Sequence, residues 1–249
     1  MGRRFYFTAE LTILGTVKSR SMDYLNKIRK LFALEQDGID GYSELEIQKL
    51  EEKINIVFPK TLRTYYQTLG ANNNINYCYN RLLSPEDDVA LLDGYLPIYE
   101  ENQAVVTWGI KTTDLSLDNP PVYANYDTTY DSDWELEKTH VSDFLLMMAI
   151  YNGTFGGLRY YANCLHTIPS TMVAAVESNW ELIPELSVDN QKIFTRDYTD
   201  VISLSFDGNG VCQGAFVGTM DPQLFDNILE VLDVDWSYIS FEDEDEDED

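Results

Sequence analysis

The sequence is poor in the residues that build disulfide frameworks and metal sites. It has three cysteines, Cys78, Cys164 and Cys212, at wide and unpatterned spacings, so we expect no disulfides and a reducing, cytoplasmic environment. The two histidines, His140 and His166, form no recognisable metal-ligand spacing, so a zinc site would need remote residues. We therefore expect no metal and no cofactor.

Long apolar runs are also lacking. The longest, Phe144 to Tyr151, has eight residues, whereas roughly 20 are needed to cross a bilayer. Arg3 and Arg4 precede an apolar stretch in the manner of a signal peptide, but Glu10 interrupts it and no clean cleavage site follows. A strand from Phe5 to Ile13 fits the alternation of this stretch better.

Basic residues are few. Lysine and arginine number 17 against 43 acidic residues, a net charge of −26, which repels nucleic acid and anionic membranes and favours cations or basic proteins as partners. Residues 1–34 carry seven basic and two acidic residues, so the remaining chain carries −31. We divide the chain into this basic strand and helix, a domain over residues 35–241, and a disordered acidic tail over residues 242–249, which either solubilises the protein or attracts a basic partner.

Helix signals dominate the first third of the chain. Apolar residues at helical spacing predict an amphipathic helix over residues 23–32 that docks on the body. Ser43 and Glu46 have the spacing of a capping box, which predicts a helix directly after Ser43. Pro59 should lie in the first turn of the next helix, and Gly70 should end it in the left-handed conformation.

Strand signals follow, with short connections that favour an antiparallel meander. Ser142 is expected to cap a buried helix that runs through Asn152, the turn over residues 207–210 to form a hairpin, and Asp221 with Pro222 to start a last helix. The fold class is therefore α+β, a mainly antiparallel sheet with helices packed against it. The expected strands are Leu96–Glu100, Ala104–Ile110, Pro121–Asn125, Trp134–Glu137, Lys192–Arg196, Val201–Phe206 and Val211–Val217.

Catalytic and nucleotide-binding motifs are missing from the sequence. There is no phosphate loop, no dinucleotide fingerprint and no nucleophile elbow. A calcium loop starting at Asp127 or at Asp131 fails at its required Glu or Gly position. We therefore expect a protein that is not an enzyme, with an unrecognised hydrolase as the remaining catalytic alternative.

One acidic cluster is dense enough to be a candidate binding site. Acids alternate with other residues here, which would place them on one face of a strand, either as a solvated surface or as partners for lysine and arginine of another protein. Nearby tyrosines would supply anchors, and a second acidic patch lies earlier in the chain. The candidate residues are Asp127, Asp131, Asp133, Glu135 and Glu137 with Tyr126 and Tyr130, and Glu86, Asp87 and Asp88 in the second patch.

Several segments resemble the SUKH superfamily, in the order in which that family shows them. The first is IQKLEEKINIVFPKTLRTYYQTLGANNN, and the later ones are YEENQAVVTWGI, DNPPVYANY and DSDWELEKTHVSDFLLMMAIYNGTFGGL. Together they cover roughly residues 40–165, and the later strands and last helix resemble the C-terminal part of longer bacterial members more loosely. The matching positions are Glu52, Pro59, Gly70, Glu101, Asn102, Trp108, Gly109, Pro121, Val122, Trp134, Ser142 and Phe144.

This resemblance implies an α+β fold and a function in binding. Most members of the superfamily are bacterial immunity proteins of polymorphic toxin systems, and a fungal branch regulates cell-wall synthesis. The resemblance therefore implies a cytoplasmic protein that binds and neutralises a cognate toxin, for which a basic nuclease would suit the charge. The alternative it implies is a regulatory scaffold or adaptor. It assigns no role to residues 1–34 or to the acidic tail.

Overall fold

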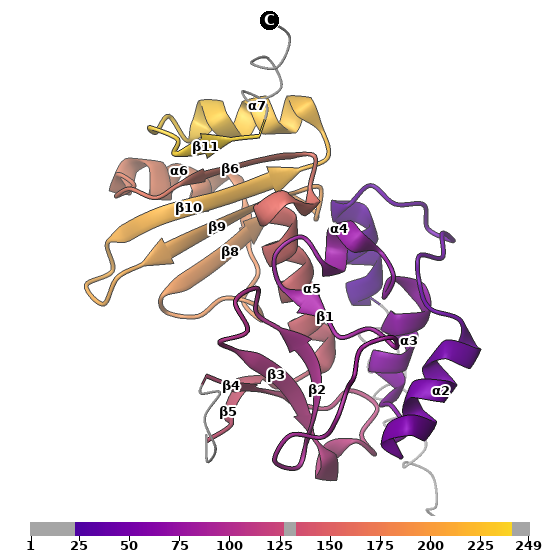
Figure 1. Cartoon of the computed structure of the whole chain (residues 1–249). Helices are drawn as coiled ribbons and strands as arrows, with labels where there is room; N and C mark the ends of the chain where they lie inside the picture. The colour runs from indigo at the N-terminus through magenta and orange to yellow at the C-terminus, as the bar shows by residue number, and fades with distance from the viewer. Residues whose placement is uncertain (1–22, 127–132, 241–249) are drawn as a thin grey trace, which may run out of the picture.

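The computed structural model describes residues 23–126 and 133–240. They form two antiparallel sheets with helices packed against them, which confirms the predicted α+β class (Figure 1). The expected strand Phe5–Ile13 and the tail 242–249 lie outside the described residues. No other observation bears on the domain boundaries predicted from charge.

The elements follow one another from helices to sheet, and then to a second sheet with its own helices. The described helices are residues 23–31, α2 (Glu44–Ile54), α3 (Lys60–Thr68), α4 (Asn73–Asn76), η1 (Thr112–Asp114), α5 (Val141–Asn152), the π-helical η2 (Gly153–Gly157), α6 (Ser170–Asn179) and α7 (Pro222–Val231). The strands are β1 (Arg81–Leu82), β2 (Tyr95–Glu100), β3 (Thr107–Lys111), β4 (Val122–Asn125), β5 (Glu135–Lys138), β6 (Tyr160–Cys164), β7 (Glu181–Leu182), β8 (Gln191–Thr195), β9 (Asp200–Phe206), β10 (Cys212–Thr219) and β11 (Tyr238–Ile239).

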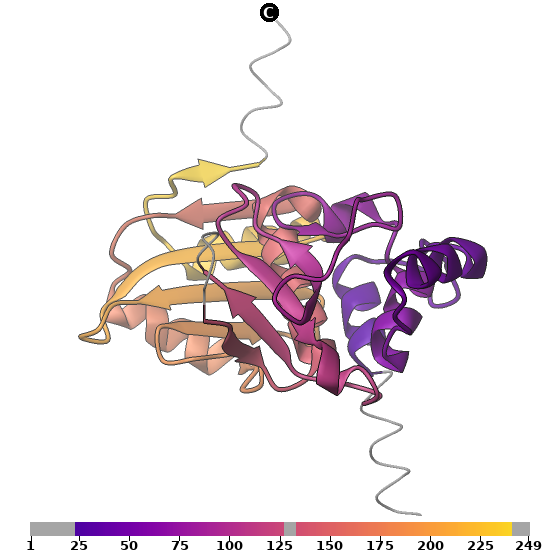
Figure 2. The ribbon, with the colours of Figure 1, turned by 60° about the horizontal axis from the view of Figure 1, so that its bottom comes forward.

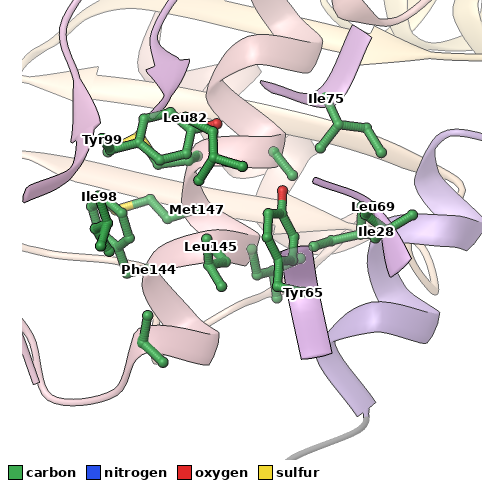
Figure 3. Close-up of a cluster of buried hydrophobic side chains, with 14 of the residues drawn as sticks. Ile28, Tyr65, Leu69, Ile75, Leu82, Ile98, Tyr99, Phe144, Leu145 and Met147 are labelled. Carbon is green, nitrogen blue, oxygen red and sulfur yellow. The ribbon is translucent and has the colours of Figure 1, made fainter. Parts of the chain in front are cut away.

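The N-terminal helices form where the local signals predict them. In the capping box before α2, the Ser43 amide donates to Glu46 Oε2 at 2.7 Å and the Glu46 amide donates to Ser43 Oγ at 3.3 Å. The predicted helix near residue 23 is present and buries its apolar stripe, including Ile28, in the core (Figure 3). These elements are fixed by neighbours within a few residues, which explains why the sequence predicts them.

Two details of α3 differ from the prediction. Pro59 is the N-cap residue, with extended backbone, and the helix begins at Lys60 rather than including Pro59 in its first turn. Gly70 does not adopt a left-handed conformation. Instead, a Cβ at Gly70 would lie 2.8 Å from the backbone of Tyr66 and 3.1 Å from the ring of Tyr42. Close packing, and not backbone conformation, requires glycine at this position.

The five-stranded sheet has the order β1-β2-β3-β4-β5, an antiparallel meander as predicted. Its strands are shifted against the expected ranges. Ala104 has a positive φ of 58°, so the chain turns there and β3 begins only at Thr107. Trp134 lies just before β5, which runs on to Lys138.

Helix α5 lies at the centre of the molecule, as its apolar character predicts. Its side chains face the five-stranded sheet, the N-terminal helices and the second sheet. Figure 3 shows Phe144, Leu145 and Met147 of α5 in this buried cluster. Figure 2 shows α2 to α4 on one side of α5 and the six-stranded sheet on the other. Ile193 and Val201 of that sheet belong to the same buried cluster. A helix that is apolar all round is stable in water only in such a position.

The start of α5 corrects the predicted cap. Ser142 lies inside the helix, and the N-cap residue, His140, makes no side-chain cap. The first amides are satisfied from a distant segment instead: the Ser142 amide donates to Asn119 Oδ1 at 3.0 Å and the Val141 amide to the Pro120 carbonyl at 2.8 Å. The Asn119 amide group also donates to Ser142 Oγ at 2.9 Å. Ser142 therefore does not cap α5. The loop that contains Asn119 and Pro120 caps the helix, and Ser142 is hydrogen-bonded to that loop.

The six-stranded sheet has the order β11-β6-β10-β9-β8-β7. The predicted hairpin joins β9 to β10, with Gly210 at a φ of 76°, and Asp221 caps α7 through the amides of Gln223 and Leu224. Helices α6 and α7 pack on one face of this sheet, where they share a second core cluster with it. The sequence did not predict β1, β6, β7, β11 or α6.

A buried polar network joins the end of α5 to the asparagine-rich turn. Asn152 receives the Asn80 amide at 2.8 Å and donates to the carbonyls of Ile75 at 2.7 Å and Asn80 at 2.9 Å. Its amide also donates to the Tyr99 hydroxyl at 3.3 Å. Because Asn152 is fully buried, water cannot replace these partners if they are lost.

Asn152→Ala should therefore lower the free energy of unfolding by about 3 kcal/mol, because three backbone groups lose their partner in a buried site. Urea denaturation measures the change. Asn190→Ala is the matched control, since Asn190 is exposed and its loss should cost no more than about 0.5 kcal/mol. Equal stability of the two variants would contradict the role given to Asn152.

Candidate binding surface

The described part of the predicted acidic cluster lies along the edge of the five-stranded sheet. β5 is the outermost strand, and we call Tyr126, Asp133, Glu135 and Glu137 the acidic edge. The pairing of β4 with β5 passes from Tyr123↔Leu136 to Val122↔Lys138, so Glu137 is an extra, bulged residue. Such bulges change the direction of a side chain at a sheet edge.

The bulge places Glu137 between two aromatic donors. Its Oε2 accepts a hydrogen bond from the Tyr126 hydroxyl at 2.9 Å and from Trp108 Nε1 at 3.4 Å. Its other carboxylate oxygen accepts none from the described residues. The carboxylate is therefore held in one orientation and keeps an oxygen for an external donor.

The charge of Glu137 also acts on neighbouring phenols. Burial, and then the Glu137 carboxylate, raise the pKa of Tyr126 to about 12, so this hydroxyl remains a hydrogen-bond donor at neutral pH. Burial chiefly raises the pKa of Tyr151 as well, and Glu137 adds to the increase. The Tyr151 hydroxyl donates to Gln191 Oε1 at 2.5 Å. The acidic edge therefore lies near the junction of α5 with the second sheet.

No base of the same strand neutralises these acids. Between Lys111 and Lys138 the sequence has seven acidic residues and no basic one. Lys138 is buried and donates to the carbonyls of Leu186 at 3.1 Å and Glu185 at 3.4 Å, and burial lowers its pKa. Asp133 and Glu135 form no side-chain hydrogen bond or ion pair in the described part of the chain.

The other predicted residues divide into two groups. Asp127, Tyr130 and Asp131 lie outside the described residues. In the second patch, Asp87 has an internal role: it receives the Ser84 amide at 2.6 Å and Arg81 Nη1 at 2.8 Å. Burial opposes the ionisation of Asp87, but these hydrogen bonds outweigh it and lower the pKa of the carboxyl.

The rest of the second patch is only partly occupied. Asp88 pairs with Lys53 at 2.9 Å, whereas Glu86 is exposed and its carboxylate has no described partner. Most of this acidity is used inside the fold. The acidic edge is therefore the better candidate for binding another molecule.

Sequence reasoning missed the participants contributed by distant elements. In the sequence, Trp108 is marked only as a position that matches the SUKH pattern, and Tyr151 and Gln191 belong to a buried helix and to the second sheet. No local pattern marks them. The one available signal is chemical: the indole N–H of a buried tryptophan such as Trp108 needs an acceptor, and the alternating acidic segment offers several.

One surface cleft, of about 640 Å³, is lined by residues 55–60, Arg63 and residues 115–118 and offers no comparable arrangement. Arg63 is already paired with Glu44 and Glu51. Within the described residues, no three His, Cys, Asp or Glu side chains come together in a way that could hold a metal ion. No helix in the described ranges is long and apolar enough to span a bilayer.

Comparisons with known proteins assign no family. No family model, no curated protein and no solved structure matches the chain. Function must therefore be argued from the residues and their arrangement.

Replacing Glu137 by Gln should lower the pKa of Tyr126 from about 12 toward its ordinary value of 10.0, because the negative charge that opposes the phenolate is removed. NMR titration of isotope-labelled tyrosine measures this, with Tyr126→Phe to assign the signal. Glu86→Gln should leave the titration unchanged. An unaltered Tyr126 titration in Glu137→Gln would show that the carboxylate does not act on this ring.

Proposed function

We propose that the chain is a binding protein that captures a basic partner protein through the acidic edge. The observation that carries this proposal is that Glu135 and Glu137 of β5 form no ion pair within the described residues, while Lys138 of the same strand is buried against the carbonyls of Glu185 and Leu186. Acids that serve only the fold would be paired, as Asp87 is with Arg81. Unpaired acids at a sheet edge attract lysine and arginine from outside.

The resemblance to the SUKH superfamily supports a specific version of this function. We propose an immunity protein that binds and neutralises a cognate toxin, with a basic nuclease domain as the partner, and that it acts by binding and not by catalysis. Cys164 and Cys212 lie on neighbouring strands of the second sheet with free thiols. A cytoplasmic location, where such thiols remain reduced, is part of the same proposal.

Charge and aromatic contact would have separate tasks at this surface. Exposed ion pairs contribute little affinity once salt screens them, but they accelerate encounter. Tyr126 is 58% exposed and fixed by Glu137, so its ring offers a rigid contact area. The partner should therefore be recognised by charge and retained by aromatic contact.

The test is co-expression and association kinetics with a protein encoded beside this chain, chosen because its sequence has a basic, nuclease-like domain. Changing Asp133, Glu135 and Glu137 to Asn, Gln and Gln should slow association at low salt by about tenfold and flatten its salt dependence. Protection of cells against the toxin should weaken in parallel.

A control variant with the same loss of charge separates local from overall effects. Three exposed acids lie at the end of α7 and just after it, Glu230, Asp233 and Asp235. Changing them to Gln, Asn and Asn should leave the rate within about twofold. Equal effects of both triple changes would refute the acidic edge as the site. A neighbouring protein that neither harms cells nor binds this chain would refute the immunity function.

A further inference from the structure

Aromatic side chains also pack on the face of the five-stranded sheet that is turned away from α5. We call this the outer face. Phe144 of α5 contacts Trp108, with ring centroids 5.9 Å apart, so Trp108 points toward the covered face. The next residue, Gly109, faces the opposite way. A Cβ at Gly109 would lie 3.1 Å from ring atoms of Trp134. The Trp134 ring therefore lies directly over Gly109 on the outer face.

Two tyrosines and a leucine complete this cluster. Tyr95 stacks on Trp134 with ring centroids 4.1 Å apart and planes 10° from parallel, and meets Tyr123 edge-on at 5.5 Å. Leu136, the cross-strand partner of Tyr123, is 57% exposed. We call these four residues the aromatic patch. The open face of an antiparallel sheet is normally polar, so an apolar group of this kind indicates a contact surface.

Carboxylates border the aromatic patch. Asp133 and Glu135 precede and follow Trp134, so they lie across the edge strand from its ring, and on the side of Tyr95 burial and the nearby Asp114 carboxylate raise the pKa of that phenol. Lys111, the cross-strand partner of Tyr95, adds one opposing positive charge. An apolar centre with a charged rim is the usual anatomy of a protein interface, and the sign of this rim requires a basic partner.

We propose that the aromatic patch is the apolar centre of the interface whose charged rim is the acidic edge, and that it receives an arginine and an adjacent apolar side chain of the basic partner. The inference rests on the proposed function. The two surfaces lie on the two sides of β5, with Trp134 and Leu136 on the outer face and Glu135 on the other, and they meet at this strand because it is at the edge of the sheet, where one partner can contact both sides. A guanidinium stacks on aromatic faces and is more weakly hydrated than an ammonium, so arginine suits the rings better than lysine.

Two peptides with blocked ends test this surface, pentalysine and Arg-Leu-Arg-Leu-Arg. Because residues of the two surfaces alternate along one strand, side-chain signals of the full chain separate them: pentalysine should shift only side-chain signals of the acidic edge, and the leucine-containing peptide should also shift the Leu136 methyl and Trp134 indole signals. Leu136→Ser should weaken binding of the latter by about fivefold, the effect of losing one apolar contact, and leave pentalysine within about twofold. Leu165→Ser is the matched control, at a residue that is 61% exposed and directly follows β6. It should change the binding of neither peptide.

A second variant tests the charge of the rim. Lys111→Gln removes the opposing charge without touching the rings and should strengthen binding of the leucine-containing peptide by about twofold. If this peptide shifts only the acidic edge, or Leu136→Ser leaves its affinity unchanged, the aromatic patch is not a contact surface and the acidic edge stands alone. If neither peptide shifts the acidic edge, the proposed function fails together with this inference.

Discussion

The side-chain amide of Asn152 joins three segments around which the rest of the chain is arranged. It closes hydrogen bonds to Asn80 and to the carbonyl of Ile75 in the asparagine-rich turn, and to Tyr99 of β2. Asn76 extends the network, since it accepts from Tyr65 of α3 at 2.7 Å. Buried polar networks are costly when incomplete and specify one arrangement when complete. The last turn of α5, where this network ends, is also the point from which the chain leaves for the second sheet.

The charge pattern at the acidic edge follows from how β5 meets the second sheet. Lys138 could have neutralised the neighbouring acids, but its amine is buried against the carbonyls of Glu185 and Leu186. Burying an ammonium without a carboxylate is unfavourable, and its depressed pKa reflects that cost. The contact of β5 with the segment before β8 therefore holds the Lys138 amine against backbone carbonyls instead of in an ion pair with the acids, although the charge of Glu137 still acts on it. Packing and surface charge are coupled at this one position.

The sequence predicts well the elements whose cause lies within a few residues. The capping box at Ser43, the turn before Gly210 and the start of α7 at Asp221 are of this kind. It fails where the cause is remote: the cap of α5 comes from Asn119, and the glycine at position 70 is required by Tyr42 and Tyr66. The second sheet was incompletely predicted because β7 and β11 have two residues each, too few for a periodic pattern.

The same limit applies to the candidate site. Alternation in the segment before Lys138 correctly separates Glu135 from Trp134 and Leu136, but it does not reveal the bulge at Glu137. Nor does it reveal which acids are paired inside the fold, since that depends on where each base is placed in three dimensions. Asp87 and Glu135 look equivalent in the sequence, yet Asp87 is held by Arg81 and Ser84, whereas Glu135 has no side-chain partner in the described part of the chain.

The high acidity of the chain is therefore distributed in a way that favours recognition over simple repulsion. Arg63 of α3 pairs with Glu44 and Glu51 of α2, Arg81 of β1 pairs with Asp87 and Glu100, and Arg196 pairs with the buried Asp200. Where such bases are supplied, acidity stabilises the fold. Where the described residues supply no ion-pair partner, as for Glu135 on β5, the negative charge faces outward beside the aromatic rings. A partner must then bring the missing cation, and only one whose apolar surface also fits those rings would gain more than the weak energy of screened charges.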